Sequence, residues 1–161
     1  MWSEQELDKQ LSIPSDKLIN DIKQIRGDIM VLGAGGKMGP TLCLLAQNAC
    51  KEANVDKKIT AVSRFSDKFA TDLLTTNNIH CIKGDLLDKT FIDNLPDCEN
   101  IIYMAGRKFG TNSQEYLTWA MNVWLPSRVA ERYKNSRIVV FSSGNVYPQL
   151  PVNSGGAISG K

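Results

Sequence analysis

A glycine-rich run, Gly33-Ala34-Gly35-Gly36-Lys37-Met38-Gly39, comes directly after an apolar segment and opens a segment with helical periodicity. In this GxxGxxG spacing, Gly33 permits a tight turn, Gly36 lets backbone N–H groups approach a pyrophosphate, and Gly39 allows close contact between helix and strand. The N-terminus of the following helix would add partial positive charge for the phosphates. The run therefore predicts a pyrophosphate site for NAD or NADP, and a turn without a ligand is the alternative. The predicted contacts are Gly33, Gly35, Gly36, Lys37, Met38 and Gly39.

The residues that end the second apolar segment bear on the choice between these two cofactors. An acidic residue roughly 20 positions beyond the glycine run would bind the adenosine ribose hydroxyls and select NAD. This sequence has Ser63-Arg64 there instead. A hydroxyl beside a guanidinium suits a 2′-phosphate, because arginine makes charge-assisted bidentate contacts with phosphate oxygens. Ser63 and Arg64 therefore favour NADP over NAD, and the alternative is that Arg64 projects into solvent.

The cysteines and the single histidine do not indicate a metal site. The cysteines form no CxxC pair, and His80 lies in an apolar stretch with no second histidine to pair with it. Such spacing does not fit a structural zinc site. We therefore predict no metal ion and expect buried, reduced thiols of a cytosolic protein. These thiols are Cys43, Cys50, Cys81 and Cys98.

Five short apolar runs alternate with segments of helical periodicity. The runs span residues 28–32, 58–62, 79–82, 100–104 and 137–141. Apolar strands separated by helices indicate βαβ crossovers and a parallel sheet covered on both faces. Right-handed crossovers then favour a doubly wound α/β (Rossmann) sheet with strand order 3-2-1-4-5, truncated after strand five.

The helices between these strands are predicted over residues 40–52, 66–74, 89–95 and 113–134. Ser66 has the residue type of an N-cap, so the second of these helices is expected to begin there. Pro126 lies inside the last one. Because proline removes a backbone N–H from a helix interior, we expect a kink or a restart at Pro126.

Residues 1–27 precede any strand signal and carry leucine and isoleucine at helical spacing. The pattern is interrupted at Ile13-Pro14-Ser15, where Ser15 could cap a second helix. We expect two short amphipathic helices that cover the core, and contact with a partner is the alternative. Residues 1–27 are thus predicted as an N-terminal helical extension, and residues 28–161 as the dinucleotide-binding domain.

The amino-acid composition limits which kinds of binding partner and which cellular compartment are expected. The 161 residues carry 19 basic and 17 acidic side chains, a net charge of +2. This balance gives no electrostatic reason to expect nucleic acid or an anionic membrane as a partner. No apolar run approaches the roughly 20 residues that span a bilayer. The polar start, MWSEQELDKQ, is not typical of a signal peptide. We therefore expect a cytoplasmic protein.

Four further motifs appear in order along the chain. They are Gly84-Asp85-Leu86, Met104-Ala105-Gly106, Asn122-Val123 and Phe141-Ser142-Ser143-Gly144-Asn145-Val146-Tyr147-Pro148. With the glycine run they resemble the extended short-chain dehydrogenase/reductase family, in particular its nucleotide-sugar epimerases, dehydratases and reductases. The resemblance covers about residues 28–150.

The resemblance implies roles for the residues that follow the third and fourth strands. Asp85 and Leu86 would contact the adenine. Ala105 and Gly106 would line the path to the nicotinamide ribose. Asp85 could instead be only a turn or cap residue.

It also implies roles near the reacting centre. Asn122 would help to order the wall of the active site, with a helix-surface amide as the alternative. Ser143, four residues before Tyr147, would match the catalytic serine or threonine of the family. Ser142 is the second candidate for that position.

One feature of the family is absent from these 161 residues. Family chemistry relies on a Tyr-x-x-x-Lys pair, in which the lysine lowers the tyrosine pKa for proton exchange with the substrate while the cofactor exchanges hydride. Four residues beyond the tyrosines lie Arg107, Ala120, Arg137 and Pro151, so none is lysine. The chain stops at Lys161, about where that helix should begin. We expect an N-terminal part of a longer enzyme, and a natural short protein is the alternative.

Two consequences follow for function. The resemblance implies the cofactor-binding portion of an NAD(P)-dependent epimerase, dehydratase or reductase that is inactive by itself; a non-catalytic NAD(P)-binding sensor or scaffold is the alternative. The full-length form would act on a small molecule, and Ser143 would hydrogen-bond the reacting oxygen. Arg107 and Lys108 could hold a substrate anion or lie in a solvated loop. The fifth strand would be an open edge that a homodimer could cover.

Overall fold

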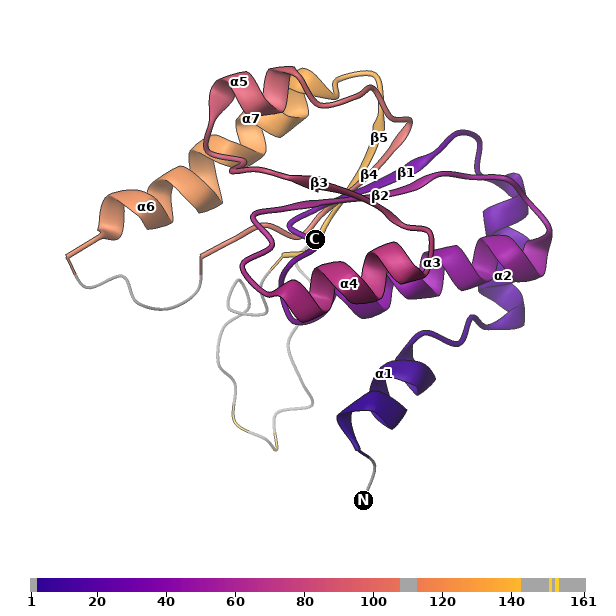
Figure 1. The fold of residues 1–161 in the computed structure, drawn as a ribbon. Coiled ribbons are helices and arrows are strands. Elements are labelled where there is room, and N and C mark those ends of the chain that lie inside the picture. The colour runs from indigo at the N-terminus through magenta and orange to yellow at the C-terminus, as the bar shows by residue number, and fades with distance from the viewer. Residues whose placement is uncertain (1–2, 108–112, 143–150, 152, 154–161) are drawn as a thin grey trace.

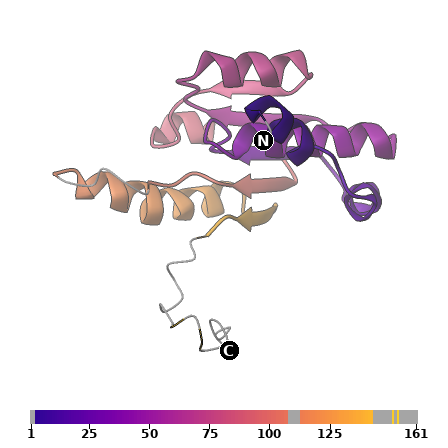
Figure 2. The ribbon, with the colours of Figure 1, turned by 90° about the horizontal axis from the view of Figure 1, so that it is seen from below.

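Five parallel strands form one twisted sheet in the computed structural model, which describes residues 3–107, 113–142, 151 and 153. The strands lie in the order β3-β2-β1-β4-β5, with β5 at the outer edge (Figures 1 and 2). Both the doubly wound order and the strands are as predicted, each strand within one residue of its expected bounds. The strands are β1 (Ile29–Leu32), β2 (Ile59–Ser63), β3 (His80–Lys83), β4 (Asn100–Tyr103) and β5 (Arg137–Val140).

Helices cover both faces of the sheet. The helices α3 (Gly39–Ala53) and α4 (Lys68–Thr76) lie on one face, and α5 (Lys89–Asp93) and α7 (Leu125–Arg132) lie on the other (Figure 1). All four residues of β1 are buried. Because neighbouring side chains of a strand point to opposite faces, Val31 joins the core under α3, while Met30 joins the core that contains Val129 of α7. This two-sided burial explains the uninterrupted apolar runs of the sequence.

The two predicted N-terminal helices are present as α1 (Glu4–Leu11) and α2 (Asp16–Gln24). Ser15 caps α2 as expected, since its side chain accepts a hydrogen bond from the N–H of Leu18. Ile22 of α2 is buried in the same core as Ala46 of α3. Helix α2 therefore covers core residues. The division of the chain into an extension and a domain at residue 27 stays a prediction.

The predicted cap of α4 is wrong by one residue. Asp67, not Ser66, is the N-cap, and its Oδ1 accepts a hydrogen bond from the N–H of Phe69 at 2.9 Å. Both residue types cap well. The helix that starts at Lys68 buries Ala70 and Leu74.

The helical segment predicted over 113–134 is divided at the expected place. It consists of α6 (Glu115–Trp119), a π-helical segment (Ala120–Trp124) and α7, in whose first turn Pro126 lies. Pro126 has no N–H to donate to the carbonyl of Asn122, four residues earlier. The helix widens around Asn122 and restarts at Leu125.

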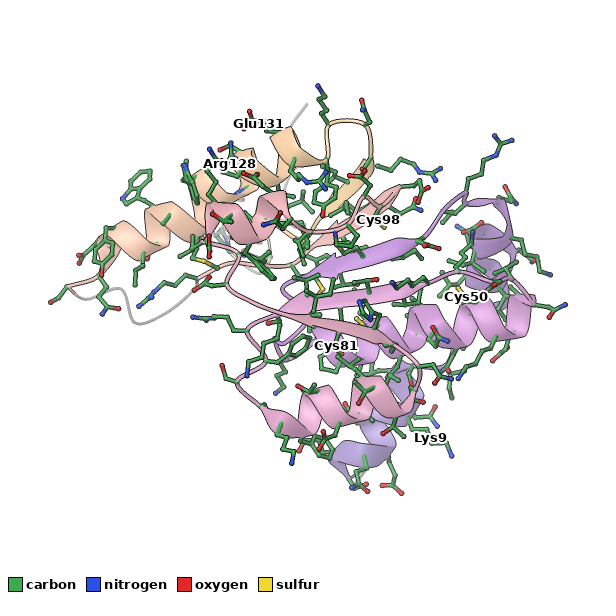
Figure 3. The ribbon with its side chains drawn as sticks, turned by 45° about the horizontal axis from the view of Figure 1, so that its top comes forward. Lys9, Cys50, Cys81, Cys98, Arg128 and Glu131 are labelled. Carbon is green, nitrogen blue, oxygen red and sulfur yellow. The ribbon has the colours of Figure 1, made fainter. Side chains whose placement is uncertain are left out.

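Helices α5 and α7 are linked by charged side chains. Arg128 forms ion pairs with Asp93 of α5, at 3.3 Å, and with Glu131 on its own helix. Figure 3 shows Arg128 and Glu131 side by side on α7. These pairs lie at the surface, where each contributes little to stability. The pair with Asp93 joins α7 to α5, whereas the pair with Glu131 lies within α7.

The four cysteines are free thiols in the structure. Cys43, Cys50 and Cys98 are buried as predicted, whereas Cys81 on β3 is half-buried. Figure 3 shows Cys50, Cys81 and Cys98 well apart from one another. Among the described residues, no group of three His, Cys, Asp or Glu side chains could hold a metal ion. No helix in the same part of the chain is both long and apolar enough to cross a membrane.

Candidate dinucleotide-binding site

A cavity of about 290 Å³ lies at the carboxyl ends of β1, β2, β3 and β4. In this strand order the chain leaves β1 toward one side and β4 toward the other, so a crevice opens between their ends. The structure brings nine of the predicted cofactor residues together around this cavity. They are Gly33, Gly35, Gly36, Ser63, Arg64, Asp85, Leu86, Ala105 and Gly106.

The glycine run begins with a left-handed turn. Gly33 has a φ of 92°, which side chains rarely allow, as predicted for the tight turn. The N–H groups of Gly33 and Ala34 both donate to the carbonyl of Val62, at 2.9 and 3.1 Å. The start of the run is therefore held against the end of β2.

Gly36 and Gly39 are glycine for different reasons. A Cβ at Gly39 would lie 2.1 Å from the carbonyl oxygen of Ala34, so α3 packs directly on the backbone of the run. A Cβ at Gly36 would have only the Gly33 oxygen nearby, at 3.6 Å. The protein itself leaves space at Gly36, which also lines the cavity. This is the geometry expected where a ligand approaches the backbone closely.

The N-terminus of α3 is uncapped and free of negative charge. Met38 is the N-cap residue and forms no side-chain cap hydrogen bond, and no acidic residue lies in the first turn. A 15-residue helix with such an end presents partial positive charge and N–H groups that no side chain satisfies. An anion, such as a phosphate, fits this end of the helix.

The end of β2 carries the predicted selectivity residues. Ser63 and Arg64 both line the cavity, and Arg64 is exposed. The next residue, Phe65, is buried although its φ is 45°, an unusual conformation for an aromatic residue. This turn redirects the chain toward α4 while Arg64 stays at the cavity wall.

Asp85 forms a turn contact and also lines the cavity. Its Oδ1 accepts a hydrogen bond from the N–H of Leu87 at 2.9 Å, which is a turn-forming contact. Asp85 also lines the cavity, beside the buried Leu86. A preceding side chain is excluded at Gly84, where a Cβ would lie 2.1 Å from the ring of Phe91.

Asn122 does not line the cavity. Its Oδ1 accepts a hydrogen bond from the N–H of Arg107 at 2.8 Å, and its Nδ2 donates to the carbonyl of Arg107 at 2.9 Å. Gly106, which does line the cavity, directly precedes Arg107. Asn122 thus holds the segment after β4, which agrees with a role in ordering a wall of the site.

Other predicted residues lie away from the cavity lining or outside the description. Lys37, Met38, Gly39 and Ser142 are described and do not line the cavity. Ser143 and Lys108 lie outside the described residues. The guanidinium of Arg107 donates to Oε1 of Gln114 at 2.8 Å, so this cation is bonded within its own loop.

Six lining residues were missed by the sequence reasoning. Three of them, Phe65, Gly84 and Met104, directly adjoin predicted residues, and Ser66 and Asp67 follow Arg64 within three positions, so the position of these five in the sequence was a usable signal. Met121 comes from the π-helical segment, and no local pattern indicated it. The six are Phe65, Ser66, Asp67, Gly84, Met104 and Met121.

The family model of the NAD dependent epimerase/dehydratase family matches residues 29–157. This chain belongs to that family. The match includes all five strands and the whole cavity lining. The resemblance found in the sequence motifs is therefore confirmed at the level of the family. No curated protein sequence matches the chain.

Solved structures of other proteins share the fold of this family member. MoeE5 in complex with UDP-glucose and NAD is 24% identical, with a TM-score of 0.60 over 77% of this chain and 39% of its own. Helicobacter pylori ADP-L-glycero-D-manno-heptose-6-epimerase is 16% identical, with a TM-score of 0.63 over 88% and 46%. The Bordetella bronchiseptica enzyme WbmG, in complex with NAD and UDP, is 17% identical, with a TM-score of 0.61 over 81% and 43%. The chain spans less than half the length of each of these proteins.

Proposed function

We propose that this chain is the cofactor-binding portion of an NAD(P)-dependent epimerase, dehydratase or reductase that acts on a hydroxyl or carbonyl carbon. The observation that carries the proposal is the cavity at the strand ends, where the open backbone of Gly36 lies near the uncapped N-terminus of α3. The bound nicotinamide would supply hydride exchange. The complexes of MoeE5 and WbmG with nucleotides support a sugar nucleotide as the substrate class.

The residues present fit the cofactor along the length of the cavity. The N-terminus of α3 and Gly36 would hold the pyrophosphate. Asp85 and Leu86, at the end of β3, would contact the adenine, and Ala105 and Gly106, after β4, would line the path to the nicotinamide ribose. These roles follow the family resemblance and agree with the lining of the cavity.

We propose NADP as the preferred cofactor. Arg64 is exposed at the cavity wall beside Ser63. The two carboxylates of the same wall, Asp67 and Asp85, already accept backbone N–H groups at 2.9 Å. A 2′-phosphate at this end would meet a guanidinium and a hydroxyl, which favour its charge.

The proton-transfer groups of the family reaction would come from elsewhere in the polypeptide. Tyr103 and Tyr133 are buried, burial raises the pKa of each to about 12, and their hydroxyls donate to the backbone carbonyls of Met121 and Pro96. Neither can serve as an acid–base tyrosine near neutral pH. Ser143 would hydrogen-bond the reacting oxygen. The chain alone should therefore bind cofactor and show little or no turnover.

Titration with NADPH and NADH tests this proposal. We expect NADPH to bind more tightly, and Arg64→Ala to weaken NADPH about tenfold or more while leaving NADH nearly unchanged. Arg64→Lys should recover part of the loss, because the charge remains without the planar fork. Lys9→Ala, which removes an exposed cation of α1 that does not line the cavity, is the control.

Each failure has a distinct meaning. Equal affinity for both cofactors that Arg64→Ala does not change would reject the NADP preference and keep the binding site. No binding of either cofactor would reject the proposed function itself.

A non-catalytic dinucleotide sensor or scaffold is the second candidate. It needs no Tyr-x-x-x-Lys pair, and none lies within these 161 residues. Turnover of UDP-sugars by the full-length polypeptide, followed by product analysis, separates the candidates: a sensor binds the dinucleotide without converting a substrate.

A homodimer is proposed for the open edge of the sheet. Strand β5 pairs only with β4 within the described residues, and Val139, Val140 and Phe141 are exposed there. Such an edge normally needs cover. Sedimentation equilibrium at several concentrations gives the mass, and a monomer at all of them would reject the dimer.

A further inference from the structure

Gly35 lies directly against the side chain of Ser63. A Cβ at Gly35 would be 2.5 Å from Ser63 Oγ, 3.1 Å from Ser63 Cβ and 3.7 Å from Cδ1 of Phe65. The φ of Gly35 is not in the left-handed region, so the backbone would accept alanine. The space taken by Ser63 is therefore the reason for glycine at this position.

The backbone of Ser63 cannot move away from Gly35 without breaking hydrogen bonds on both sides. The carbonyl of Ser63 accepts from the N–H of Gly84 at 3.0 Å, and Ser63 is paired with Lys83 of β3. The carbonyl of the preceding residue, Val62, accepts the N–H groups that begin the glycine run. A side chain at position 35 would therefore force the Ser63 hydroxyl into another rotamer.

We propose that Gly35 is a positioning residue for the choice between NADP and NAD. Because it has no side chain, the Ser63 hydroxyl can occupy the adjacent space and face the cavity. The inference rests on the proposed function. NADPH and NADH differ only at the 2′ position, so a displaced Ser63 hydroxyl would lose a hydrogen bond to the 2′-phosphate of NADPH and little to NADH. Gly35 would thus act on the ratio of the two affinities.

The neighbouring Gly36 supplies a matched control. Its own Cβ would meet no side chain, only the Gly33 oxygen at 3.6 Å. Alanine at Gly36 would leave Ser63 in place and project toward the pyrophosphate, which both cofactors share. Gly36→Ala should therefore lower the affinity for both cofactors by the same factor. Gly35→Ala should instead lower the affinity for NADPH more than that for NADH.

The experiment measures NADPH and NADH affinity for the wild type, Gly35→Ala, Gly36→Ala, Ser63→Gly and the double variant Gly35→Ala/Ser63→Gly. We expect Gly35→Ala to lower the NADPH preference about tenfold, and Ser63→Gly to do the same. Because both changes remove one interaction, the double variant should match Ser63→Gly alone instead of adding a second loss.

Several results would overturn the inference. An unchanged NADPH-to-NADH ratio in Gly35→Ala, or equal losses for both cofactors as in Gly36→Ala, would reject the positioning role while the binding site stands. If Gly35→Ala does not fold, the double variant must fold, because glycine at 63 removes the two nearest atoms that a Cβ at 35 would meet and leaves only Cδ1 of Phe65, at an ordinary contact distance of 3.7 Å. Failure of both variants to fold would reject the steric pairing. A wild type that binds neither dinucleotide would reject the proposed function and this inference with it.

Discussion

The side-chain amide of Asn122 forms hydrogen bonds with both backbone groups of Arg107, accepting from its N–H at 2.8 Å and donating to its carbonyl at 2.9 Å. The two residues are 15 positions apart, on the π-helical segment and on the segment after β4. A Cβ at Gly106 would lie 3.4 Å from the same amide oxygen. One side chain therefore holds the backbone that follows β4 at the cavity.

Replacement of Asn122 by alanine removes both hydrogen bonds. We expect the free energy of unfolding to fall by about 0.5–1.5 kcal/mol, because the pair is exposed and water replaces part of it. NADPH and NADH affinity should fall together, since the segment lies away from the 2′ position. Urea unfolding and cofactor titration check this. Asn20→Ala, on the exposed side of α2, is the control. Equal changes in stability and cofactor affinity in the two variants would contradict a role for the hydrogen bonds between Asn122 and Arg107.

Alanine at Gly39 should destabilise the fold, whereas alanine at Gly36 should not. The new Cβ at position 39 would lie 2.1 Å from the Ala34 oxygen, a backbone atom that cannot rotate away. We expect Gly39→Ala to cost about 1–3 kcal/mol or more. Gly36→Ala should stay within about 0.5 kcal/mol of the wild type. Thermal and urea unfolding of both variants decide the matter, and equal stabilities would show that α3 does not pack as described.

The buried thiol of Cys43 predicts a loss of stability in alkali. Burial, with a smaller effect of the nearby Cys81 thiol, raises the pKa of Cys43 from its ordinary 9.0 to about 12. Well below pH 9 the thiol is protonated in both states and contributes nothing to the pH dependence. Between pH 9 and 12 only the unfolded chain ionises there, so the free energy of unfolding falls by about 1.4 kcal/mol per pH unit from this group.

This slope is checked by measuring the free energy of unfolding of the wild type and Cys43→Ala between pH 9 and 10, a range below that in which the buried tyrosines contribute. The variant should lose stability less steeply than the wild type, whatever its stability at neutral pH. Cys81→Ala, which removes a half-buried thiol, should change the slope less. Identical slopes for the wild type and Cys43→Ala would contradict the prediction.

Helix α2 should unfold together with the rest of the structure. Ile22 of α2 is 2% exposed and belongs to the core that contains α3 residues. We expect Ile22→Ala to lower the free energy of unfolding by about 2–5 kcal/mol, in a single transition. Ile13→Ala removes an exposed side chain from the neighbouring turn and should have little effect. A separate early transition in the wild type would show that α2 folds on its own.

The strands and their order were predictable from the sequence because both depend on local pattern. The apolar run at β1 is buried on two faces, and right-handed crossovers leave few possible orders for five such strands. The left-handed turn at Gly33 was equally local, since its conformation tolerates few other residues. Ser63 and Arg64 were indicated by their distance in the sequence from the glycine run, and Asp85 was indicated by the family resemblance; all three line the cavity.

Contacts between distant segments were decided only by the tertiary structure. The backbone of Gly35 is not in the left-handed region, so its conformation does not require glycine. Position 35 requires glycine because β2 places the Ser63 side chain against it. Asn122 meets Arg107, and Met121 reaches the cavity, from the π-helical segment that precedes Pro126. Residue periodicity specifies which face of an element is buried, whereas the height at which two elements cross depends on the packing of the whole core. The sequence alone therefore indicates the glycine turn and the strand-end residues, and the fold determines which of them act on one another.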